Sequence, residues 1–144
     1  MSDEKMIAYL KSKDIEIPED TNQITNLFFG TLVVDSIKYW HGRSCDFMDN
    51  NEPSKPYVRL NSAIAKTDKN RREIFSNLNK ETKEQIKDLI RESIEGVLFS
   101  LFAKIDEDWK LILKTNGENK KGIVNNDTEL HEDLYKWINS FSDK

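Results

Sequence analysis

The stretch KETKEQIKDLIRESIEGVLFSLFAKI, residues 80–105, decides the fold class of this chain. Its large apolar residues recur from Ile86 to Ile105 at steps of mostly three and four, which is the period of an α-helix. Charged residues fill the opposite face up to Glu95, and beyond Gly96 the segment is apolar all round. We therefore expect a long helix whose C-terminal half is buried on most sides.

A second segment has the same period over a wide apolar arc and runs to about Trp40. Asp20 or Thr21 can cap its start with a side-chain oxygen. Gly30 lies inside this segment, where glycine costs roughly 1 kcal/mol relative to alanine, so it indicates a close approach by another element. Because Gly30 and Gly96 both lie in apolar stretches, we expect the two helices to cross near these glycines.

Shorter elements complete the predicted fold. We expect a short helix over residues 3–13, an irregular stretch at 41–57, and helical segments interrupted at 66–69. A hairpin of residues 109–114 with 123–124 and a final helix opened by a capping box of Asn126 and Glu129 follow. The final helix is expected to bury Leu130, Leu134, Trp137 or Ile138, and Phe141.

These elements define the expected architecture. The fold class is α+β and predominantly helical, with several packed helices, a short C-terminal β-hairpin and a final helix. The length of 144 residues is typical of one domain, so we expect a single domain over residues 1–144. Aromatic residues make up 10% of the chain, which argues against disorder despite 33% charged residues.

The charge balance indicates the kind of partner. The net charge is −4, and residues 73–144 carry all of it, with 11 basic and 15 acidic side chains. Nucleic-acid binders usually have a basic surplus, so no nucleic-acid partner is expected. A basic cluster at Lys66, Lys69, Arg71 and Arg72 is expected to be a solvated surface. A mildly acidic protein attracts a basic partner at long range.

The sequence also indicates a compartment. The chain begins with an acidic rather than a basic segment, Met-Ser-Asp-Glu-Lys, and no apolar core of a signal peptide follows. The longest uncharged stretch, Thr21 to Val34, is about 14 residues and too short to span a bilayer. We expect a cytoplasmic protein without a membrane partner, in which the single cysteine, Cys45, stays reduced.

Catalytic and metal-binding patterns are sparse. No glycine-rich phosphate loop, G-x-S-x-G or H-E-x-x-H motif occurs. His41, Cys45 and Asp46 are the residues on which a small enzyme would depend, but a Cys–His spacing of four has little specificity. His41, Cys45 and His131 are the only soft metal ligands, and a closed zinc site would need a fourth ligand. We expect no catalytic residue, no metal and no cofactor.

The absence of a catalytic pattern favours a binding protein, with contacts at the irregular stretch and at the acidic turn after residue 105. Trp40 and Tyr57 flank that stretch and are as consistent with a binding hot spot as with the core, whereas Trp109 and Trp137 are expected in the core. The predicted partner-binding residues are Trp40, Arg43, Asp46, Asp49, Glu52, Tyr57, Asp106, Glu107 and Asp108.

The helical segment Ile94–Phe102, the hairpin after Trp109 and the closing helix Leu130–Phe141, in a small acidic chain, resemble bacterial immunity proteins. The resemblance implies a protein that docks on and neutralises a secreted toxin domain, and it transfers no residue role. A phage- or plasmid-encoded inhibitor of a host defence enzyme has the same physical character and remains an alternative. A small enzyme using Cys45 and His41 is the third hypothesis.

Overall fold

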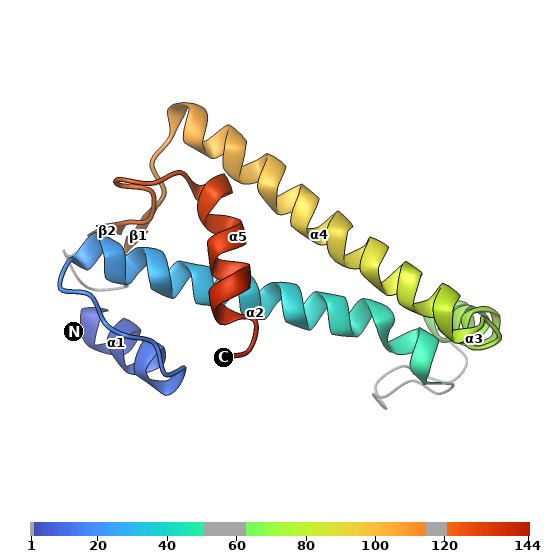
Figure 1. Ribbon diagram of the computed structural model, residues 1–144. Helices are drawn as coiled ribbons and strands as arrows, with labels where there is room; N and C mark the ends of the chain where they lie inside the picture. Colours follow the sequence, from blue (N-terminus) through green and yellow to red (C-terminus); the bar gives the residue numbers. More distant parts are fainter. Residues whose placement is uncertain (1, 51–62, 115–120) are drawn as a thin grey trace. The chain divides into compact units, whose positions relative to one another are not determined.

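The computed structural model describes residues 2–50, 63–114 and 121–144. The elements in chain order are α1 (Ser2–Ser12), α2 (Thr21–Asp49), α3 (Ala63–Ser76), α4 (Lys80–Asp108), β1 (Ile112–Lys114), β2 (Lys121–Ile123) and α5 (Leu130–Phe141) (Figure 1). The described chain is therefore predominantly helical α+β with a hairpin before the last helix, which confirms the expected fold class. None of the described helices is both long enough and apolar enough to cross a membrane.

The described residues group into two compact units. One unit combines Met1–Lys38 with Glu95–Lys144, and we call it the terminal unit. The other unit comprises Tyr39–Ile94, and we call it the central unit. The boundaries fall inside α2 and α4, so each of these helices contributes to both units. The single domain over residues 1–144 stays a prediction.

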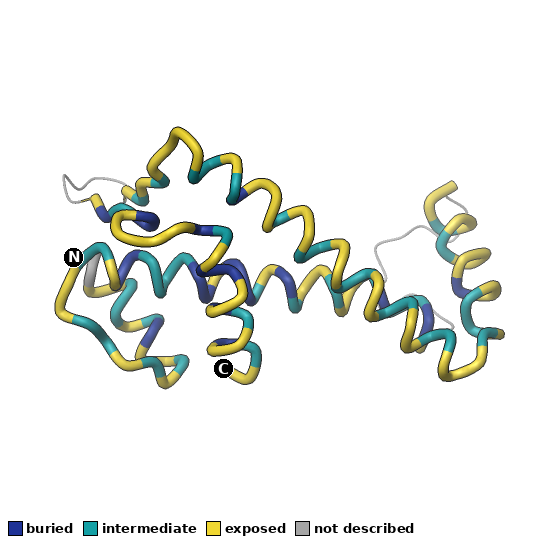
Figure 2. The backbone as a smooth tube through the Cα atoms, turned by 45° about the horizontal axis from the view of Figure 1, so that its top comes forward, coloured by how far each residue is buried: buried dark blue, intermediate teal, exposed yellow. Residues whose placement is uncertain are grey.

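The core of the terminal unit lies where α5 crosses the first part of α2 (Figure 1). The indole of Trp137 packs directly on Gly30, and the rings of Phe29 and Phe102 lie 5.8 and 6.2 Å from it. Buried residues gather along α5 and the first half of α2 (Figure 2). The apolar face predicted for the final helix is confirmed, and so is the core position of Trp137. The other buried apolar residues of α5 are Leu130, Leu134 and Phe141.

The hairpin is antiparallel and lies against the start of α2. Ile112 pairs with Ile123, as the sequence predicts for the two segments. The side-chain oxygen of Asn22 accepts a hydrogen bond from the main-chain N–H of Ile123 at 2.8 Å. Gly122 lies so close to the Thr25 side chain that a Cβ at this position would overlap it. The hairpin is thus fixed to α2 by side chains about 100 residues away in sequence.

The predicted limits of α2 and α3 are partly wrong. Asp20 does cap α2, because its carboxylate accepts the N–H of Gln23 at 2.9 Å. However, α2 continues to Asp49, so residues 41–49 are helical, and residues 51–57 lie outside the described chain. Helix α3 runs unbroken through residues 66–69. In the structure Asp46 and Asp49 of α2 pair with Arg72 and Lys87, and Asp68 of α3 pairs with Arg72 one turn further on.

Helix α4 begins as expected after Asn79, whose side chain accepts the N–H of Thr82 at 2.8 Å. Its C-terminal half is mostly exposed, and Phe102 is its one buried residue among those described. A Cβ on Gly96 would meet nothing within 4 Å. The predicted all-round burial and the predicted crossing at the glycines are therefore wrong. The space beside Gly30 is filled by Trp137 of α5 instead.

Candidate functional site

An exposed apolar row runs along the C-terminal half of α4 to Trp109, the residue that follows the helix. Val97, Leu101 and Trp109 have exposed fractions of 69%, 51% and 71%, and we call these three residues the α4 stripe. The N–H of Trp109 donates to the carbonyl of Ile105 at 2.8 Å, so Trp109 continues the helical hydrogen-bond pattern. Val97 and Leu101 lie four residues apart and Trp109 lies eight further on, so the three side chains follow one row of the helix surface. The prediction that Trp109 lies in the core within a strand is wrong.

The backbone that carries Trp109 is held by one buried amide. Asn125 is 1% exposed, and its Nδ2 donates to the carbonyl of Trp109 at 3.1 Å and to Asp106 Oδ1 at 3.0 Å. Its Oδ1 accepts the N–H of Leu111 at 2.8 Å. Folding removes water from these polar groups, and the Asn125 amide replaces the hydrogen bonds that they lose. The indole of Trp109 is therefore exposed on a fixed backbone.

Asp106 joins α4 to α5 and is not an exposed contact residue. Its side chain is 7% exposed, and Oδ2 accepts the N–H of His131 at 3.1 Å and the His131 Nδ1–H at 2.8 Å. Glu129, the residue before α5, makes no side-chain capping bond, so the predicted capping box with Asn126 is wrong. The acceptor comes from α4 instead. Burial raises the pKa of Asp106, but these hydrogen bonds outweigh it and leave the pKa below its ordinary value.

Glu107 and Asp108 are exposed in the last turn of α4, beside the α4 stripe, and they are helical rather than part of a turn. The two units differ in charge. The central unit has 11 basic and 9 acidic side chains, a net charge of +2, and the terminal unit has 11 and 17, a net charge of −6. The α4 stripe thus belongs to the acidic unit.

Trp40 and Arg43 lie on α2 in the central unit. The Trp40 ring is 55% exposed and contacts the Tyr39 ring edge-on, with centroids 5.4 Å apart. The Arg43 guanidinium lies 5.9 Å from the Trp40 ring centroid and donates to the Tyr39 hydroxyl at 3.2 Å. This is a second surface with the residue types of binding hot spots. Glu52 and Tyr57 lie outside the described residues.

Asp46 and Asp49 are ion-paired within the central unit. Asp46 accepts from the Arg72 guanidinium at 2.9 Å. Arg72 is buried, whereas Lys66, Lys69 and Arg71 are exposed, as expected for the rest of the basic cluster. The hydrogen bond from Arg72 holds the pKa of Asp46 below its ordinary value. Asp49 pairs with Lys87 at 2.9 Å and, by hydrogen bonding, raises the pKa of Lys87. Both aspartates join α2 to other helices of this unit.

Cys45 is a free, buried thiol on α2 with an exposed fraction of 6%. Burial raises its pKa, which lowers the thiolate fraction that nucleophilic chemistry requires. His41 lies 2.9 Å, through Nε2, from the main-chain carbonyl of Lys87. The arrangement is typical of a cysteine that packs in a core rather than one that attacks a substrate.

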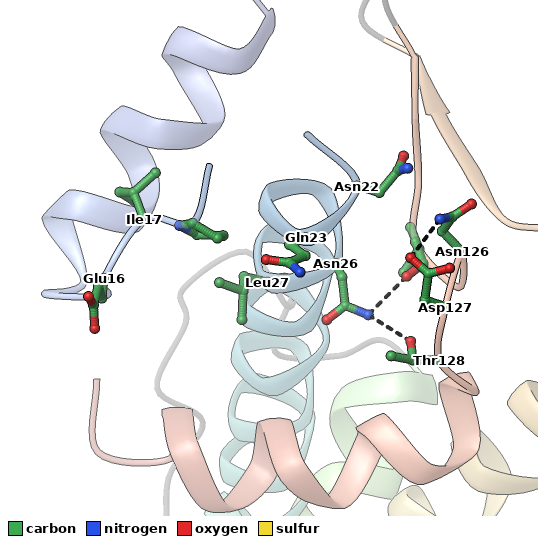
Figure 3. Close-up of a pocket in the computed structure, with 11 residues that line it drawn as sticks. Glu16, Ile17, Asn22, Gln23, Asn26, Leu27, Asn126, Asp127 and Thr128 are labelled. Atoms are coloured by element: carbon green, nitrogen blue, oxygen red, sulfur yellow. Dashed lines mark hydrogen bonds between the residues drawn. The ribbon is translucent and has the colours of Figure 1, made fainter. Parts of the chain in front are cut away.

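A cavity of about 430 Å³ lies in the terminal unit between the segment after α1, the start of α2 and the turn before α5 (Figure 3). Asn26 lines the cavity, and its Nδ2 donates to the Val124 carbonyl at 2.9 Å and to Asp133 at 2.8 Å. Its Oδ1 accepts the Trp137 indole N–H at 3.2 Å. Asn22, also at the cavity, holds the hairpin. These two amides serve the packing of α5 and the hairpin on α2.

The fold and these surfaces define a predominantly helical α+β protein with an exposed apolar helix face. Comparison with protein-family models, with curated proteins and with solved structures gave no match. The sequence selected Glu107 and Asp108 but missed the three members of the α4 stripe. Their apolar character and their spacings of four and eight residues were visible, and we interpreted them as core.

Proposed function

We propose that this chain is a protein-binding domain that docks on a basic partner protein through the α4 stripe and inhibits it. The exposure of Val97, Leu101 and Trp109 is the observation that carries this proposal. Large apolar side chains in one row on a helix are typical of a surface that a partner covers. Spacing by one and two helical turns suits a helix that lies in an apolar groove of the partner.

The rigid display of Trp109 supports the same function. A side chain that is already ordered loses less conformational entropy on binding, and tryptophan is the residue type most enriched at hot spots. The hydrogen bonds of Asn125 fix the backbone at Trp109 and at Leu111 before any partner arrives. Truncation of this side chain should therefore remove a large share of the affinity.

Charge supports a basic partner. Glu107 and Asp108 flank the α4 stripe, and the terminal unit carries a net charge of −6. Such a surface attracts a positively charged protein over a distance of about a Debye length, roughly 8 Å at physiological salt. The acidic residues would then act mainly on the association rate, and the apolar residues on the dissociation rate.

As a finer proposal, the chain is a toxin-neutralising immunity protein, and the partner is a secreted toxin domain. The support is the small acidic chain, the resemblance of its helix–hairpin–helix order, and the docking surface. A phage- or plasmid-encoded inhibitor of a host defence enzyme would use the same surface. An enzyme using Cys45 and His41 has less support, because the thiol is buried and its pKa is raised.

Parallel capture from the native host tests the proposal. The wild-type chain, Trp109→Ala and Trp40→Ala are immobilised, and the retained proteins are identified by mass spectrometry and then purified. We expect a basic protein that binds the wild type and Trp40→Ala alike. Its affinity for Trp109→Ala should fall by about 30-fold or more, the effect of a hot spot of about 2 kcal/mol.

Trp40→Ala is the matched control, because it removes an indole of similar exposure from the central unit. Charge reversal at Glu107 and Asp108 should slow association and reduce its dependence on salt. Inhibition is measured as the partner's own activity, or as growth of cells that express the partner with and without this chain. A partner that binds Trp109→Ala as tightly as the wild type would show that the α4 stripe is not the docking surface.

A further inference from the structure

Three metal-ligating side chains meet at the start of α5. Glu129, His131 and Glu132 each offer one ligand atom, and these three atoms lie within 4.8 Å of one another. The His131 Nε2 and Glu129 Oε2 are 3.4 Å apart. That separation is close to the distance between neighbouring ligands around one tetrahedral zinc ion, whose bonds are about 2.0–2.2 Å long. Both glutamates are exposed, so an ion can reach them from solvent.

An independent feature of α4 prepares the imidazole for a metal. Asp106 Oδ2 lies 2.8 Å from His131 Nδ1, and the Asp106 side chain is 7% exposed. An ionised carboxylate only accepts hydrogen bonds, so the proton of the neutral imidazole is on Nδ1 and the lone pair is on Nε2. A carboxylate behind the ligating histidine is the arrangement that metal sites use to fix the tautomer and the ring orientation.

The Asp106 carboxylate is itself held in place. It accepts the main-chain N–H of His131 at 3.1 Å and the Asn125 Nδ2–H at 3.0 Å. The His131 ring also contacts the Phe99 ring edge-on, with centroids 5.4 Å apart. The imidazole is therefore held by Asp106 and flanked by Phe99, and its Nε2 lies 3.4 Å from Glu129 Oε2.

We propose that Glu129, His131 and Glu132 bind one divalent zinc ion, through His131 Nε2 and one carboxylate oxygen from each glutamate, with water in the fourth position. One imidazole and two carboxylates suit zinc better than magnesium or calcium, which prefer oxygen ligands alone. The positive end of the α5 dipole opposes a cation there, and the two ligating carboxylates with Asp106 behind them outweigh it. Asp106 is a positioning residue, because it would act on the metal only through His131.

The competing cation at this place is the proton. Asp106, by its hydrogen bond, raises the pKa of His131 above its ordinary value, and the charges of Glu129 and Glu132 act in the same direction. These carboxylates and the uncharged Phe99 ring are the groups that face the imidazole from α4 and α5.

Titration of the full chain with zinc chloride, followed by calorimetry and by NMR of the imidazole nitrogens, tests the site. The chain has two histidines, so each can be assigned. We expect one zinc per chain at slightly alkaline pH, a large shift of the His131 Nε2 resonance and no shift for His41. His131→Gln and Glu132→Gln should weaken binding by more than 100-fold, whereas the matched control His41→Gln should bind like the wild type.

Asp106→Asn separates a positioning role from a merely structural one. It should weaken zinc binding by about 10- to 100-fold and change the tautomer of His131 in the metal-free protein. Glu132→Gln changes an exposed residue and keeps the test valid if other variants fold poorly. Unchanged affinity in both His131→Gln and Glu132→Gln, a shift at His41 alone, or no saturable binding would overturn the proposal. The readouts are independent of any protein partner, so they stand apart from the proposed docking function.

Discussion

Replacement of Gly30 by alanine should destabilise the protein, although alanine is the better helix former. A Cβ at position 30 would lie 2.5 Å from Cδ1 and Cγ of Trp137. The indole has little room to withdraw, because the rings of Phe29 and Phe102 flank it and its N–H donates to Asn26 at 3.2 Å.

The net effect follows from three contributions. Overpacking in a core costs about 1–3 kcal/mol. Loss of the Trp137–Asn26 hydrogen bond costs about 1 kcal/mol more, and the helix propensity of alanine returns about 1 kcal/mol. The free energy of unfolding should therefore fall by about 1–3 kcal/mol, which corresponds to a decrease in Tm of about 4–12 °C for a chain of this size.

Gly96→Ala is the matched control, because Gly96 also lies inside a helix and an added Cβ there meets nothing within 4 Å. This variant should gain about 1 kcal/mol from helix propensity alone. Urea and thermal unfolding followed by far-ultraviolet circular dichroism give both values. In a Trp137→Phe background, the cost of Gly30→Ala should shrink, because the smaller ring leaves space. Equal stabilisation by both alanines would refute the packing of α5 on Gly30.

Four further predictions concern single residues. Cys45 should react with a thiol reagent much more slowly in the folded protein than in urea, since the thiol is buried and its pKa is raised; equal rates would contradict its burial. The hydrogen bond to Asp35 raises the pKa of Tyr9 to about 12, and an ultraviolet titration of wild type against Asp35→Asn should show this pKa return toward about 10. Asn125→Ala should lower the free energy of unfolding by about 2–4 kcal/mol in urea titrations, because it leaves buried polar groups without a partner. The lowered pKa of Asp106 gives stability that is present above about pH 4 and is lost as the pH falls through the folded-state pKa, and Asp106→Asn should reduce this acid dependence of Tm.

Local patterns predicted the type and order of most elements. The helix of residues 80–105, the hairpin and the apolar face of the last helix follow from spacing within one segment, and the structure confirms each. The caps at Asp20 and Asn79 are also local, because each bonds an N–H three residues on. These two caps were predictable because both partners lie within one turn, although the equally local capping box of Asn126 and Glu129 was wrong.

Long-range partners account for the errors. The helix at 41–49 looks irregular in sequence because Gly42 and several polar residues interrupt the apolar pattern. It is helical in the structure, where Arg72 and Lys87 pair with its aspartates. Asp106 looked like an exposed turn residue, and its partners at positions 125 and 131 make it the buried cap of α5. Neither set of contacts has a signature within its own segment.

The two tryptophans expected in the core show where periodicity stops being informative. Trp137 lies within a short helix that has one apolar face. Because Trp137 is on that face, periodicity alone predicts that it is buried. Trp109 follows the end of α4 and continues a row of apolar residues on that helix. Periodicity predicts the row, but it does not predict whether another element covers the row. Asn125, 16 residues further on, fixes the backbone at Trp109 and leaves the indole exposed. An apolar pattern thus predicts a face, and only the contacts of other elements decide whether that face is core or is left for a partner.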